Sequence, residues 1–189
     1  HSLGNNTVKR KFVTDGTEQN AIYWNVHNYA NDTYTSSGYT ATDLAGAKKS
    51  VTECMLVEDV YDLQNMDAKL DGNYMLAKDI NASGTSSWNY YLDVKLGINY
   101  CTGFSPVGSY DNNFIGTFDG ANHTISNFYI NDITGRSIGL FGDVSKATIQ
   151  NVGIDSNISK TGASGYGTGS VVGAATDSII RNVYNTGTV

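Results

Sequence analysis

The stretch of sequence that decides the fold runs from residue 139 to residue 183. It opens with GLFG at 139–142 and IQNV at 149–152, and the same two-part pattern returns as SVVG at 170–173 and IRNV at 180–183. Both parts move by the same interval of 31 positions, from 139 to 170 and from 149 to 180. A shared interval over two separated segments indicates a repeated structural unit that buries its apolar face by stacking on a neighbour.

An earlier copy of the pattern precedes this stretch. GTFD at 116–119 and ISNF at 125–128 lie 23 and 24 positions before the corresponding segments. The longer interval to the third copy is explained by the Gly- and Ser-rich stretch 161–170, which we expect to be a loop. Units of this length, built from short alternating strands, predict an all-β fold: a right-handed parallel β-helix, or β-solenoid.

This repeat predicts which side chains point into the core of the helix. Equivalent residues of successive coils should stack about 4.8 Å apart. The aligned copies predict three inward rows, which are Phe118–Phe141–Val172, Ile125–Ile149–Ile180 and Phe128–Val152–Val183.

An asparagine recurs in each copy, at Asn127, Asn151 and Asn182. Asparagine tolerates left-handed backbone angles and can stack its amides in a ladder. We therefore predict a structural asparagine column at one corner of the coils. The rival interpretation, recognition of a ligand by these amides, is less favoured.

The part of the chain before the repeat differs in character. Asp59 is placed to cap a short helix through Val60, Leu63 and Met66, with Gly72 at its end. Because the open end of a solenoid needs shielding from edge pairing, we expect a cap here. The predicted organisation is an extended N-terminal segment packing on the cap (1–50), a cap with the short helix and first strands (51–100), and the β-helix coils (101–189).

The composition restricts the partners of the chain. Charged residues make up only 16%, Gly counts 21 and Pro 1, and the net charge is -6, with a pI near 4.8. Binding of nucleic acid phosphates needs a basic face, which this balance does not supply. No apolar run approaches the roughly 20 residues of a membrane span. The sequence begins with His1 and Ser2 and shows no signal peptide, so we expect a processed or recombinant fragment.

The two cysteines, Cys54 and Cys101, are a candidate disulfide. In an exported protein such a pair usually oxidises, and the spacing matches no zinc motif. Two separate buried thiols remain the alternative.

Several strings resemble a known class of proteins. The string GLFG at 139–142, together with the run IQNVG at 149–153, resembles the GLUG motif of bacterial surface proteins. The strings at 60–66, 72–80, 103–108 and 116–127 appear in the order seen in large haemagglutinin-type exoproteins of the filamentous adhesin kind, including many exported by two-partner secretion. The resemblance covers about residues 20–189 and implies a secreted or cell-surface location. Similar repeats also occur in secreted immunoglobulin A metallopeptidases.

An enzyme is not predicted. Parallel β-helix lyases and hydrolases need clustered carboxylates with basic residues nearby. No repeat interval brings the candidate carboxylates and basic residues onto one face. The candidates are Asp111, Asp119, Asp132, Asp143, Arg136 and Lys146. Asp132 and Asp155 are 23 apart, an interval that allows them to stack, but like charges so close repel each other unless a cation lies between them. The chain contains no zinc-peptidase, nucleophile-elbow or P-loop motif, and we predict no cofactor and no metal.

The sequence thus predicts a structural and binding module of a surface adhesin that contributes to attachment to host cells or other surfaces. Its partner would be a receptor, glycan or protein, contacted by exposed tyrosines such as Tyr90, Tyr91 and Tyr100, although these rings could equally cover the side of the solenoid. The alternative is a non-catalytic accessory region of a secreted peptidase or a glycan-degrading enzyme.

Overall fold

The computed structural model describes residues 54–93, 97–132, 136–161 and 166–189, together with the backbone of four earlier strands. Its elements are β1 (Lys9–Thr14), β2 (Thr17–Asn25), β3 (Tyr39–Thr42), β4 (Lys48–Val51), β5 (Cys54–Val57), α1 (Val60–Asn65), η2 (Met66–Ala68), β6 (Asn73–Leu76), β7 (Ile80–Asn81), η3 (Ser83–Ser87), β8 (Tyr90–Asp93), β9 (Ile98–Cys101), β10 (Thr117–Asp119), β11 (Thr124–Asp132), β12 (Phe141–Ser145), β13 (Thr148–Lys160), β14 (Val172–Thr176) and β15 (Ile179–Asn185).

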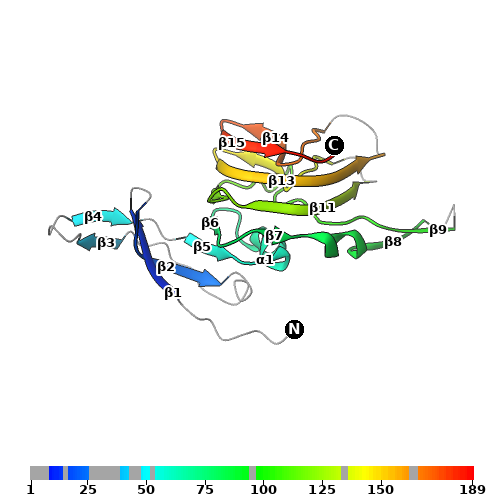
Figure 1. The fold of residues 1–189 in the computed structure, drawn as a ribbon. Coiled ribbons are helices and arrows are strands. Elements are labelled where there is room, and N and C mark those ends of the chain that lie inside the picture. The colour runs from blue at the N-terminus through cyan, green and yellow to red at the C-terminus, as the bar shows by residue number, and fades with distance from the viewer. Residues whose placement is uncertain are drawn as a thin grey trace.

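A parallel stack of strands organises the chain (Figure 1). In its first sheet, β5, β6, β10, the start of β13 and β15 pair in parallel, one after another. Their registered inward residues are Met55, Tyr74, Phe118, Ile149 and Ile180. The first four are fully buried, which gives the sheet its apolar face.

Two further groups of strands complete the stack. The second half of β13 turns away from β10 and pairs in parallel with β11, which in turn pairs with β7. The third group consists of β12 and β14, also parallel, with parallel bridges from Val107 to Phe141 and from Phe114 to Val144. Parallel pairing thus recurs in all three groups of strands.

Phenylalanines fill the space between these groups. The Phe118 ring on β10 contacts the Phe141 ring on β12 edge-on at 5.3 Å, and Phe114 lies 4.7 Å from Phe141. All three rings are fully buried. Such aromatic pairs contribute about 0.5–1.5 kcal/mol beyond the burial of their area.

The register corrects part of the predicted rows. Phe118 pairs with Ile149 and Ile149 with Ile180, so both intervals are 31 residues. The interval of 23–24 residues predicted that Phe118 and Phe141 lie in one row. They lie instead in different groups of strands, and their rings meet across the interior. Likewise Ile125 pairs with Ile154, and Phe128 with Ser156. The predicted pairings Phe141–Val172 and Val152–Val183 are present.

Burial along the first row is uneven at its end. Ile149 is fully buried, as predicted, whereas Ile180 is 39% exposed. Ile180 does stack on Ile149, but β15 pairs only with β13 among the described strands. The side of Ile180 that faces away from β13 therefore accounts for its exposure.

The short helix forms where the sequence predicts it. Asp59 has an extended backbone, and its carboxylate accepts hydrogen bonds from the backbone nitrogens of Tyr61 and Asp62. This caps α1, whose Val60 and Leu63 are buried. The cap stabilises the first turn of α1, and such a cap contributes about 1 kcal/mol to the stability of the fold.

Three pairs of described strands are antiparallel, and β3 with β4 is one of them. The hairpin of β8 and β9 extends well beyond the stack (Figure 1). In the N-terminal segment, β1 pairs antiparallel with β2, which continues the first sheet by parallel pairing with β5. The part of the chain that the structure describes is thus all-β, with a large parallel sheet and one short α-helix.

Candidate functional site

The predicted asparagine column divides into two. Asn151 and Asn182 both have left-handed backbones, with φ of 56° and 51°, and the Asn182 amide donates to the Asn151 side-chain oxygen at 3.0 Å. Asn151 in turn donates to Asp119 at 3.1 Å. Asn127 is not in this column, because its amide donates to Asn81 on the neighbouring strand β7. The prediction of one column through all three residues is therefore wrong for Asn127.

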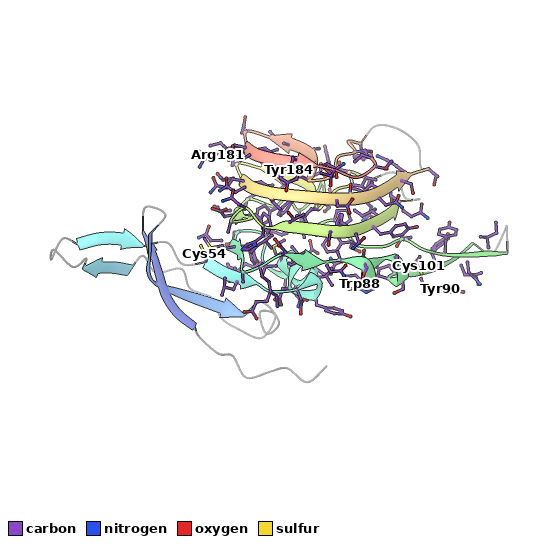
Figure 2. The ribbon with its side chains drawn as sticks, in the orientation of Figure 1. Cys54, Trp88, Tyr90, Cys101, Arg181 and Tyr184 are labelled. Carbon is purple, nitrogen blue, oxygen red and sulfur yellow. The ribbon has the colours of Figure 1, made fainter. Side chains whose placement is uncertain are left out.

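The candidate disulfide is absent. Cys54 begins β5 and Cys101 ends β9, and the structure leaves both as half-buried thiols. Figure 2 shows the two residues on opposite sides of the stack. The β8–β9 hairpin places Cys101 away from β5, the strand that carries Cys54.

A cleft of about 600 Å³ opens beside the third group of strands. Its walls come from segments far apart in the sequence: the end of η2, the loop 102–112, the end of β11, residues 136–138 and β12. Its polar and aromatic lining includes Ser105, Ser109, Asn112, Ser137, Tyr110 and Tyr166. The volume lies in the range of small-ligand sites, roughly 300–1,000 Å³.

The loop that carries Tyr110 is firmly held. Ser109 and Asn112 exchange backbone hydrogen bonds of 2.8 and 3.0 Å, which closes a turn around Tyr110. At its start, Gly108 has φ 75° and donates its N–H to the Asp67 carboxylate at 3.0 Å. A Cβ at Gly108 would lie 2.7 Å from the Phe114 nitrogen, so glycine is required. The rigid loop presents Tyr110 at the rim of the cleft.

A second tyrosine faces Tyr110 from another part of the chain. The Tyr166 ring lies 6.3 Å from the Tyr110 ring in an edge-on arrangement. Lys160 donates to the Tyr166 carbonyl at 2.8 Å and so fixes the backbone there. Both rings are exposed, Tyr110 by 72% and Tyr166 by 49%. Because tyrosine has only two side-chain torsions, such rings lose little entropy when a ligand covers them.

Acidic groups dominate the charge of the cleft. Asp67, Asp111, Asp132 and Asp143 line it, and Arg136 supplies the single guanidinium of the lining. Asp132 and Asp143 are buried, with 7% and 8% exposure, and the Ser137 hydroxyl donates to Asp143 at 3.1 Å. The lining therefore combines strong acceptors with a few donors at neutral pH.

The structure gathers residues that the sequence had left scattered. Asp111, Asp132, Asp143 and Arg136 share this cleft, whereas Asp119 lies elsewhere and binds Gln150 and Asn151. Asp132 pairs with Lys160 in the sheet, so the interval of 23 residues does not bring Asp132 and Asp155 together.

Sequence reasoning missed the two rim tyrosines of the cleft. One signal was available for Tyr166. It lies in the Gly- and Ser-rich insertion 161–170, and insertions into repeats often carry binding loops.

The tyrosines of the hairpin form a separate aromatic surface. Tyr90 is 67% exposed on β8, and the Tyr91 and Tyr100 rings contact each other at 5.3 Å across the hairpin. Figure 2 shows Tyr90 far out from the stack. These rings therefore do not cover the side of the stack, which was one of the two interpretations of their sequence.

One surface ion pair perturbs a carboxylate. The Thr124 backbone N–H donates to Asp79 at 2.9 Å, and His123 contacts the same oxygen at 3.1 Å. Together, the backbone hydrogen bond first, they hold the pKa of Asp79 below its ordinary value.

Within the described part of the chain, no cluster of three His, Cys, Asp or Glu residues could hold a metal ion. No helix there is long and apolar enough to cross a membrane.

The fold and the cleft define an all-β protein with parallel strand pairing and a polar, aromatic-rimmed site. The chain is 33% identical to halomucin of Haloquadratum walsbyi over an alignment of 167 residues, which covers 83% of the chain. It spans about 2% of the length of that protein. No family model matches the chain. No solved structure matches it either.

Proposed function

We propose that the chain is a section of a right-handed parallel β-helix that serves as a structural and binding module of a secreted or cell-surface adhesin. The observation that carries the architecture is the registered row from Met55 through Phe118 to Ile180. Together with the other two groups of strands, this row supports coils that stack in register. The GLUG-type motif at 139–142 belongs to the same proposal and rests on the residues themselves.

The similarity to halomucin supports a surface or extracellular location. Halomucin is a large surface protein, about fifty times longer than the aligned region, given the 2% coverage. A rigid stack suits such a long protein, because each coil contacts only its neighbours and extends the rod without a new core. Attachment to host cells or other surfaces is the activity we propose for the module, through a glycan or protein receptor.

The charge and the site support binding rather than catalysis. A net charge of -6 disfavours nucleic acid as a partner. The cleft offers aromatic rings and hydrogen-bonding groups, which are features of recognition sites. We propose no cofactor and no catalytic role. The alternative is an accessory region of a secreted peptidase or glycan-degrading enzyme, for which the chain would contribute architecture without attachment.

Adhesion is tested with beads coated with the purified chain. We expect saturable retention on cultured epithelial cells and on mucin-coated plates, competed by the soluble chain and absent from albumin-coated beads. Retention equal to albumin on every surface would contradict attachment and favour the accessory role.

The stacking is tested by engineered disulfides in a Cys54→Ser/Cys101→Ser background. Gln150 and Arg181 are registered neighbours whose side chains hydrogen-bond at 2.8 Å. Gln150→Cys/Arg181→Cys should oxidise readily, since adjacent strands bring Cα atoms within disulfide reach. Asp119→Cys/Arg181→Cys, two strands apart, should not. Equal oxidation of both pairs would contradict the register.

A further inference from the structure

We propose that the cleft between Tyr110 and Tyr166 is a binding site for neutral glycans. This inference rests on the proposed binding function and deepens it by assigning the site and the ligand class. Three features of the cleft carry it: the paired exposed rings, the mixture of donors and acceptors, and the balance of charge.

The rings match the shape of a sugar. A pyranose has an apolar face of C–H groups and a rim of hydroxyls, so it is recognised by an aromatic surface flanked by polar groups. Tyr110 and Tyr166 supply that surface at the mouth of the cleft, 6.3 Å apart and exposed. The turn of Ser109 and Asn112 and the bond from Lys160 hold the two backbones in place. Preorganised rings reduce the entropy lost on binding.

The polar lining matches the hydroxyl rim. Sugar hydroxyls both donate and accept, and carboxylates are strong acceptors for them. Asp111, Asp132 and Asp143 supply acceptors, while Asn112 and Arg136 supply donors. A purely cationic ligand would pair with the aspartates but would leave the donors of Asn112 and Arg136 unmatched. The lining therefore favours a glycan over a basic peptide.

The charge selects among glycans. Four aspartates face a single arginine in the lining. This excess of carboxylates over guanidinium groups opposes the binding of sialylated, sulfated and uronate-containing chains, because bringing like charges together costs free energy. Neutral oligosaccharides are left as the preferred ligands.

The test is calorimetric titration of the full chain with cellotriose, chitotriose, maltotriose and mannotriose. Sialyllactose, trigalacturonate and trilysine serve as charged comparisons. We expect at least one neutral trisaccharide to bind, and to bind more tightly than each charged probe. Tyr110→Ala and Tyr166→Ala should each weaken that binding about 5- to 10-fold, which corresponds to about 1–1.4 kcal/mol.

Tyr184→Ala is the matched control, because Tyr184 is 55% exposed, between Tyr110 and Tyr166, but lies on β15 outside the lining of the cleft. It should leave the affinity within about two-fold. Absence of binding by all four neutral probes, stronger binding of a charged probe, or an equal loss in Tyr184→Ala would overturn the assignment. Cleavage of a bound trisaccharide would overturn it as a pure binding site. Bead retention that survives both cleft variants would sink the cleft assignment while leaving attachment intact.

Discussion

Replacing Ile149 with alanine tests whether the parallel stack is a single packed core. Ile149 is fully buried and sits between Phe118 and Ile180 in the first row. The change removes three carbon atoms, which at about 0.8 kcal/mol per buried methylene is about 2.4 kcal/mol of transfer free energy. The cavity left behind adds to this, so we expect a loss of about 3–4 kcal/mol in the free energy of unfolding.

Ile180→Ala is the matched control, since it removes the same atoms from the same row. Ile180 is 39% exposed and its far side is open, so no closed cavity forms and the loss should be about 1–1.5 kcal/mol. Urea unfolding followed by tryptophan fluorescence and far-ultraviolet circular dichroism measures both variants. Coincident transitions by the two probes are needed for the comparison, because stacked repeats can unfold in parts. Equal losses, or a loss below about 1 kcal/mol for Ile149→Ala, would refute the reasoning.

Three further predictions address single features. Asn151→Ala should lower the free energy of unfolding in urea by about 1–2 kcal/mol more than Asn151→Gly does. Both variants lose the hydrogen bonds of the Asn151 side chain, but only alanine is strained at φ 56°. Equal losses would argue against backbone strain. Both Cys54 and Cys101 should react with a thiol reagent in the unfolded, unreduced chain, and reductant should leave the melting temperature unchanged; a reductant-sensitive melting temperature would restore the disulfide. Asp79 should titrate below its ordinary 3.8 in nuclear magnetic resonance, and His123→Ala should reduce but not abolish that shift, since the backbone donor remains. A depressed pKa stabilises the fold above the unfolded-state pKa, and this contribution is lost as the pH falls through the folded value.

The acidic cleft could be located only after folding. Its residues come from η2, the loop 102–112, β11, β12 and the insertion 161–170, and no interval in the sequence relates them. The sequence did identify Asp111, Asp132 and Asp143 as charged candidates, but it treated them separately because no coil interval relates the three to one another. What joins them is the way loops from different units meet at one corner of the stack.

The sequence by itself determined the local features of this protein. The 31-residue interval predicted the pairing of Ile149 with Ile180, and Asp59 predicted the cap of α1. Asn151 and Asn182 also have the left-handed conformation that their residue type favours. These features depend on backbone preference and on neighbours at a constant spacing, and both can be read from one copy of a pattern and its repeat.

Only the tertiary structure decided which sheet each earlier segment joins. The segments at 116–119 and 125–128 share the pattern of the later copies, yet they pair one sheet away from the positions that the pattern had given them. The same apolar-polar alternation suits every sheet of the stack, so it cannot distinguish between them. The choice depends on how the phenylalanines fit together in the interior, where Phe118 packs across against Phe141. That fit belongs to the folded chain as a whole, because dense packing must be satisfied by all sheets at once.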